Sequence, residues 1–439
     1  MNASRTAILL LIAAGLASVA VSGSTIASRL LYLGVILFVG ARIWTASAAR
    51  SLRLRRHARA VRLNVGDVLV EHFELENRSR VIVPWVQVEN RTDLPAAAGS
   101  RLLTMLHGGQ TQSFLARTWL TRRGGFSLGP TVVTTGDPLG LFRETVTFPA
   151  VQTLTVLPMQ LEVESFLSPP GLLPGGRAVR GKALDVTPHA AGVREYVHGD
   201  PMKRIHWPMS TRHRRLMVKE FERDPQAEVW LILDAQAGVH VAAEAFSEAI
   251  PIEAALIGSR PRFALPRATL EYAVTIAASL VRYFLRQRRA VGLLSEGRTY
   301  TVIAADRSSR QESKILETLA FVEAKGGMSL GGLVAAQLSQ FPSGSTCVLI
   351  TTTRADDVPI AAATLGRRNI RPAVVLLEAE SFRHAGRRDE GRSTVQDSRI
   401  PTCRIAYGDD IARALSSVSS RASYSEGIQW QRQPLPYSI

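Results

Sequence analysis

Cysteine is nearly absent from this chain, which has only Cys347 and Cys403 among 439 residues. Two cysteines so far apart cannot form a disulfide framework, and they cannot supply a cysteine-based zinc site. Cys347 lies in the apolar run STCVLITTT, where a buried thiol is expected. The cysteine content therefore fits a reducing compartment and excludes the class of small secreted domains held by disulfides.

Recognisable catalytic signatures are also lacking. The densest polar segment, residues 193–222, contains three histidines whose spacing matches no zinc-binding pair: His198, His206 and His213. No nucleophile elbow accompanies them. We therefore predict a protein that is not an enzyme and has no cofactor. A hydrolase that uses the cluster from Arg194 to Trp207 together with Asp234 is the alternative.

Acidic residues are in the minority. The 37 Asp and Glu are outnumbered by 53 Lys and Arg, so the formal net charge is +16 and the isoelectric point is about 10.7. Such a balance favours an acidic partner or surface. The basic residues are spread along the chain, which favours a membrane surface over nucleic acid. A nonspecific nucleic-acid binder is kept as a second alternative.

Long apolar runs occur only near the N-terminus. Residues 6–26 carry no charge over about the length that spans a bilayer, and the apolar run 30–44 follows at once. We predict a transmembrane helical hairpin in residues 1–49, with a cleaved signal peptide as the alternative. A basic cluster follows: Arg50, Arg53, Arg55, Arg56, Arg59 and Arg62. By the positive-inside rule it places the soluble part in the cytoplasm, attached to the inner cell membrane by two helices.

The rest of the chain changes its hydrophobic period twice. Residues 50–165 alternate apolar and polar positions in short segments, which predicts an antiparallel β-sandwich-like domain. Residues 166–226 read as a linker followed by the polar segment. Residues 227–425 alternate apolar strands with helices, which predicts an α/β domain with a Rossmann-like parallel sheet. Residues 426–439 have no period and predict a loose tail. The predicted fold class is α+β and multidomain.

One acidic residue closes the first strand of the predicted parallel sheet. The run AEVWLILDA ends at Asp234, and ligands of open parallel sheets bind beyond the carboxyl ends of strands. A von Willebrand A-type magnesium site needs hydroxyls in a D-x-S-x-S pattern, whereas this chain has Gln236 and Gly238. The threonines at 351–353 end a later strand and could donate oxygen. Asp234 is thus a weak candidate for a metal ligand, Mg²⁺ is a doubtful cofactor, and a structural cap at the strand end is the favoured role.

Residues 193–222, VREYVHGDPMKRIHWPMSTRHRRLMVKEFE, carry a resemblance to a known family. The succession R-E-Y, G-D, R-I-H-W, T-R and K-E-F-E is similar to the signature of the domain of unknown function 58 family, and segments 122–130 and 137–142 match it too. The signature residues, interpreted as partner-binding or structural, are Arg194, Glu195, Tyr196, Gly199, Asp200, Arg204, Ile205, His206, Trp207, Arg212, Lys219 and Glu220.

The resemblance implies a membrane-anchored protein with a von Willebrand A-like domain and no established biochemical activity. Family members are commonly encoded beside MoxR-type AAA+ ATPases, which implies a chaperone-like or assembly role with such a partner. The mixed charges around Trp207 by themselves favour a clasp between the two soluble domains, and a docking face is compatible with it. We predict a membrane-anchored scaffold that binds protein partners through its A-like domain.

Overall fold

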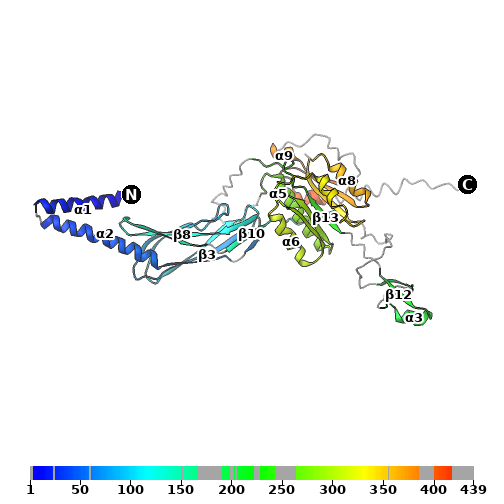
Figure 1. The fold of residues 1–439 in the computed structure, drawn as a ribbon, viewed down its shortest axis with the longest axis horizontal. Helices are drawn as coiled ribbons and strands as arrows, with labels where there is room; N and C mark the ends of the chain where they lie inside the picture. The colour runs from blue at the N-terminus through cyan, green and yellow to red at the C-terminus, as the bar shows by residue number, and fades with distance from the viewer. Residues whose placement is uncertain are drawn as a thin grey trace. The chain divides into compact units, whose positions relative to one another are not determined.

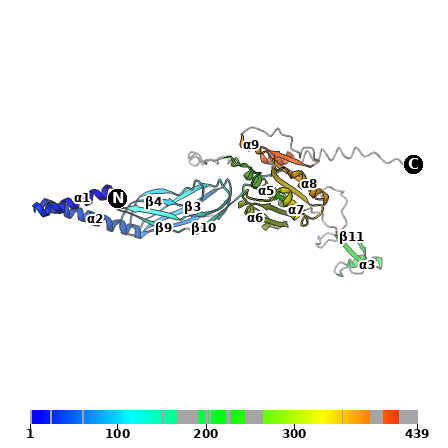
Figure 2. The same cartoon turned by 45° about the horizontal axis from the view of Figure 1, so that its top comes forward.

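The structure is a computed structural model that describes residues 3–22, 25–58, 61–149, 152–166, 190–197, 202, 205–221, 228–243, 264–353, 355–384 and 400–417. It is a mixed α/β fold with several multi-stranded sheets, as the ribbon in Figures 1 and 2 shows. The chain divides into two compact units, which consist mainly of Met1–Met159 and of the residues from Gln160 onward.

The first unit opens with two helices that contact each other, α1 (Ala3–Ser22) and α2 (Thr25–Ser51). Glycines permit the close approach: a Cβ on Gly34 would lie 3.0 Å from Ile12 Cγ1, and one on Gly15 would lie 3.3 Å from Leu31 Cβ. Among the described residues, α2 alone is long and apolar enough to cross a membrane, and the apolar part of α1 is shorter. The sequence therefore contains one helix suited to membrane anchoring.

Helix α2 leads without a break into strand β1 (Leu52–Ala58). Ala48, in the last turn of α2, and Leu52 are fully buried, and both belong to one apolar core with Phe73 and Val86. The end of the helix is therefore part of the β domain.

Three sheets build the β domain. Their strand orders are β1-β3-β6, β5-β4-β8-β9 and β2-β10-β7. All neighbours are antiparallel except β2 and β10. The bounds are β2 Arg62–Asn64, β3 Val68–Asn77, β4 Val83–Asn90, β5 Arg101–Leu106, β6 Thr111–Trp119, β7 Gly124–Leu128, β8 Thr131–Gly136, β9 Arg143–Phe148 and β10 Gln152–Leu157. Apolar side chains of the first two sheets share one core, which explains the alternation of buried and half-buried residues along β3.

Part of the arginine cluster after α2 is built into this domain. Arg56 lies on β1 with Nε 3.2 Å from Oε1 of Glu71, and the two side chains are 12% and 0% exposed. Burial lowers the pKa of Arg56 and raises the pKa of Glu71, because desolvation outweighs their mutual attraction. Arg56, which the sequence analysis counted among the positive-inside charges, is thus half of a buried ion pair.

The loop at residues 137–142 fastens the helices to the β domain. The buried carboxylate of Asp137 accepts hydrogen bonds of 2.9, 3.2 and 2.6 Å from the backbone amides of Leu139, Leu141 and Phe142. The ring of Phe142 lies 5.1 Å from the ring of Phe38 on α2, and the Arg5 guanidinium lies 4.5 Å above it. This family-like segment therefore has a structural role.

The second unit contains a six-stranded sheet in the order β15-β14-β13-β16-β17-β18. All neighbours are parallel except β14 and β15, which are antiparallel. The strands are β13 Val229–Leu233, β14 Val291–Glu296, β15 Tyr300–Asp306, β16 Thr346–Thr352, β17 Arg371–Leu377 and β18 Thr402–Ile405; the helices are α5 Thr269–Arg286, α6 Ser309–Ala320, α7 Leu330–Gln337, α8 Val358–Arg367 and α9 Ala379–Arg383. Every residue of β13 is buried, so both faces of the sheet are covered.

The chain enters this unit along α5. The Leu161 amide donates to Ser279 Oγ and the Phe166 amide donates to the Tyr283 hydroxyl, both at 2.9 Å. The Phe166 ring also packs against Phe284 with 6.0 Å between centroids. Residues 160–166 are therefore held on α5 before the chain reaches the signature segment.

Candidate functional site

The signature residues form a small two-stranded module. Strand β11 (Ala190–Glu195) pairs antiparallel with β12 (Met217–Phe221), and helix α3 (Trp207–His213) lies between them in sequence, as labelled in Figures 1 and 2. Of the predicted site residues, Gly199, Asp200 and Arg204 lie outside the described residues. Three more are described by their backbone alone, at strand positions: Arg194, Lys219 and Glu220.

His206 and Ser210 hold this module together. His206 is the N-cap of α3: its Nδ1 accepts from the Met209 amide at 3.1 Å, and its own amide donates to the Met217 carbonyl at 2.7 Å. Ser210 Oγ accepts from the Met217 amide at 2.8 Å and donates to the His206 carbonyl at 3.0 Å. Ile205 is 6% exposed and bridges to β12. His206 and Ile205 therefore have structural roles.

The outer surface of the module is apolar and basic. Its large apolar side chains are exposed by 62%, 70%, 63% and 44%: Val197, Met202, Trp207 and Leu216. Arg212 is also exposed, and Tyr196 is half-buried. Arg215 lies 3.5 Å from Glu195, but both side chains are more than half exposed, so this pair contributes little stability. The module thus carries four exposed large apolar side chains and several exposed arginines.

A second candidate lies where β13 and β16 end. The order of the parallel sheet reverses between these two strands, which is where open α/β sheets bind ligands. Asp234 follows β13 and is 2% exposed. Its Oδ2 accepts from Thr351 Oγ1 at 2.5 Å and its Oδ1 accepts from the Gln236 amide at 3.0 Å. Burial raises the pKa of Asp234, and the hydrogen bonds from Thr351 and Gln236 oppose that rise only in part.

His240 closes this edge, and the sequence analysis missed it. Its Nε2 lies 2.8 Å from the Asp234 carbonyl oxygen, and a carbonyl only accepts, so Nε2 carries a proton. Its Nδ1 lies 3.0 Å from Oγ1 of Thr269, which also accepts from the Val241 amide at 2.9 Å. No sequence signal marks His240, because its side-chain partner Thr269 lies on α5, 29 residues away.

The residues at this edge do not fit a magnesium site. Gln236 and Gly238 stand where the two hydroxyls are needed. The threonine oxygens face inward instead: Thr351 donates to Asp234, and Thr352 Oγ1 donates to the Val239 carbonyl at 2.9 Å. Throughout the part of the chain that the structure describes, no three His, Cys, Asp or Glu side chains lie close enough to hold a metal.

An open hollow of about 510 Å³ adjoins this edge. Two imidazoles and a guanidinium line it, together with three small apolar residues: His240, Arg383, His384, Val241, Ala242 and Ala243. The Arg383 guanidinium, which lies 3.4 Å from Glu380, and the His384 imidazole can donate hydrogen bonds to a carboxylate or another anion. Both ring nitrogens of His240 contact Asp234 and Thr269 instead. The edge can therefore receive an acidic group, and it lacks the oxygen ligands that a cation would need.

Comparison with known proteins found one family model and one curated relative that match part of this chain. Residues 192–257 match the family model described as protein of unknown function DUF58. The chain is also similar to the uncharacterized protein YeaD of Bacillus subtilis strain 168, with 28% identity over 204 residues, 44% of this chain and 44% of that protein. The chain thus matches less than half the length of this curated relative. Both matches support the resemblance to the domain of unknown function 58 family.

Two solved structures show weaker likeness. One is the CARDB domain of a Pyrococcus furiosus protein in complex with di-metal ions, with a TM-score of 0.19 and 11% identity over 24% of this chain and 91% of that chain. The other is from the complex of zinc 2-glycoprotein and prolactin inducible protein from human seminal plasma, with a TM-score of 0.18 and 13% identity over 24% of this chain and 92% of that chain. Likenesses of this size bear on neither fold nor function.

Proposed function

We propose that this chain is a membrane-anchored scaffold that binds a protein partner and has no catalytic activity of its own. In this proposal α1 and α2 cross the inner membrane as a hairpin, and both soluble units lie in the cytoplasm. The apolar composition of α2 and the arginines that follow it support this orientation.

The exposure of Trp207 on the signature module is the observation that carries this proposal. Trp207 is 63% exposed, so the module itself leaves this side chain uncovered. Tryptophan and arginine are the residues that contribute most to binding energy at protein interfaces. The exposure of Trp207 and of Arg212 therefore supports a docking face on this module.

The α/β unit supplies a second contact in this proposal. Its doubly wound sheet supports a von Willebrand A-like assignment, although the edge at Asp234 lacks the oxygen ligands of an A-type metal site. The hollow beside this edge instead offers the donors of Arg383 and His384 to an acidic side chain of the partner. The family resemblance points to a MoxR-type AAA+ ATPase as that partner.

Affinity purification from native membranes in mild detergent, with and without ATP, tests the proposal. Trp207→Ala should reduce recovery of the ATPase about 30-fold, since a central aromatic contributes about 2 kcal/mol or more. Tyr300→Ala is the matched control, because Tyr300 is an aromatic residue that is 44% exposed on β15. If the ATPase is recovered equally with wild type and with Trp207→Ala, Trp207 is not part of the docking face.

A further inference from the structure

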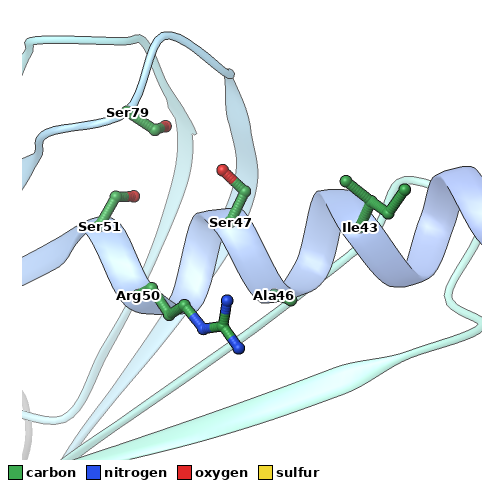
Figure 3. A pocket seen from close by; sticks show the side chains of 6 residues that line it. All are labelled: Ile43, Ala46, Ser47, Arg50, Ser51 and Ser79. Atoms are coloured by element: carbon green, nitrogen blue, oxygen red, sulfur yellow. The ribbon is translucent and has the colours of Figure 1, made fainter.

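A second hollow lies at the end of α2, within the first unit. Its volume is about 490 Å³, and Figure 3 shows the six residues that line it: Ile43, Ala46, Ser47, Arg50, Ser51 and Ser79. All come from the last turns of α2 except Ser79, which lies on the loop between β3 and β4. The hollow is thus formed where the apolar helix joins the β domain.

The lining changes from apolar to polar along the helix. Ile43, 64% exposed, lies toward the apolar part of α2, and Arg50 follows seven residues later, which is about 10 Å along the helix axis. The hydroxyls of Ser47 and Ser51 lie on the side of the helix that faces Ser79 (Figure 3). An amphiphilic molecule would meet apolar atoms at one end of the hollow and donors at the other.

The polar side of the hollow is preorganised. Asn77 is fully buried, and its Oδ1 accepts from Ser51 Oγ at 3.1 Å and from Ser79 Oγ at 2.7 Å. The Arg78 amide also donates to the Ser51 carbonyl at 3.1 Å. These bonds fix the loop against α2, so the hollow persists without a ligand.

Positive charge surrounds the same place. The arginines on or next to the lining segments are Arg42, Arg50, Arg53, Arg78 and Arg80. Two of them are paired with carboxylates, Arg42 with Glu144 at 3.2 Å and Arg78 with Glu76 at 3.0 Å. Basic side chains therefore outnumber the carboxylates here, and Arg50 is exposed at the hollow itself.

We infer that this hollow binds the headgroup of an anionic phospholipid, with the phosphate at Arg50 and the glycerol end toward Ile43. A guanidinium suits a phosphate diester, and the negative leaflet surface attracts basic segments beside a membrane helix. The inference rests on the proposed membrane anchoring by α2, because only that places the hollow at the level of lipid headgroups.

Native mass spectrometry of the full chain in mild detergent tests this site. The chain would be titrated with phosphatidylglycerol and, separately, with phosphatidylcholine, and bound lipid would be counted. Arg50→Gln should weaken phosphatidylglycerol binding about fivefold, since one arginine at a membrane surface contributes about that factor. Arg117→Gln is the control with the same charge change, because Arg117 is exposed and pairs with Val70 near the start of β3, away from Asn77 at its end.

Each outcome decides between the proposals. Loss in Arg50→Gln but not in Arg117→Gln supports the site. Equal binding of the two lipids by wild type, equal loss in both variants, or full displacement by soluble glycerol 3-phosphate would overturn it. Carbonate extraction of membranes separates the two ideas: a chain that stays inserted but shows no lipid preference refutes the lipid site alone, whereas release of the wild-type chain refutes the anchoring and the lipid site with it.

Discussion

Replacement of Thr351 by Val should destabilise the α/β unit by about 2 kcal/mol. The Thr351 hydroxyl donates to a carboxylate that is 2% exposed, and hydrogen bonds to buried charged groups contribute about 1.5–3 kcal/mol. Valine keeps the shape and leaves Asp234 Oδ2 without this donor. Amide exchange in peptides that cover β13 and β16 should become about 30-fold faster at neutral pH.

The cost should depend on pH. Because burial raises the pKa of Asp234, the native chain holds its proton more tightly than the unfolded chain. The wild-type free energy of unfolding therefore falls as pH rises from the ordinary carboxyl range toward the raised native pKa. Thr351→Val raises this pKa further, because a hydrogen bond to the charged form is lost. The variant should thus lose most stability above that pKa and least below it, where Asp234 is protonated.

Thr346→Val on the same strand is the matched control. Within the described residues, the buried Thr346 hydroxyl has no hydrogen-bond partner, so its removal should be neutral or slightly stabilising. Similar losses for the two valine variants, or a cost of Thr351→Val that is the same at pH 4 and pH 7, would refute the assigned role of the Thr351 bond.

Two further predictions concern other buried groups. Asp137→Ala should lower the free energy of unfolding of the β domain by about 2–4 kcal/mol, because three backbone amides lose their acceptor. Thermal unfolding measures this loss. Asp93 is exposed, so Asp93→Ala is the control and should have no comparable effect. Burial raises the pKa of the Cys347 thiol, so iodoacetamide at pH 8 should label it in urea but not in the native chain, and rapid native labelling would contradict its burial.

The regular elements of the α/β unit follow from sequence periodicity. β13 and β16 are apolar runs, and α5 has one continuous apolar face. The local sequence pattern is therefore enough to predict both the strands and the helix. Strand β15 was not predicted, because an edge strand has mostly exposed or half-buried positions and carries a weak pattern. The strand character of β1 was hidden for a different reason: its arginines indicated a membrane signal, while one of them pairs with Glu71.

The candidate sites depend on contacts that no local pattern shows. Asp234 was identified at a strand end, but its partner Thr351 is 117 residues away. Only the fold shows that the Thr351 hydroxyl donates to the Asp234 carboxylate rather than binding a cation. The signature segment was identified as a unit, yet its sequence could not distinguish the cap at His206 from the exposed ring at Trp207. Tertiary placement decides which of two adjacent residues is structural.

The continuity of α2 with the β core has a mechanical consequence. Since Ala48 and Leu52 belong to one packed core, the β domain cannot swivel on the helix as on a hinge. α2 has 27 residues and is about 40 Å long, and its second half contacts the β domain from Phe38 onward. β3 has 10 residues and is about 33 Å long. If α2 is anchored in a membrane as proposed, a tilt of the helix by about 10° would therefore move the far end of the β domain by about 6 Å.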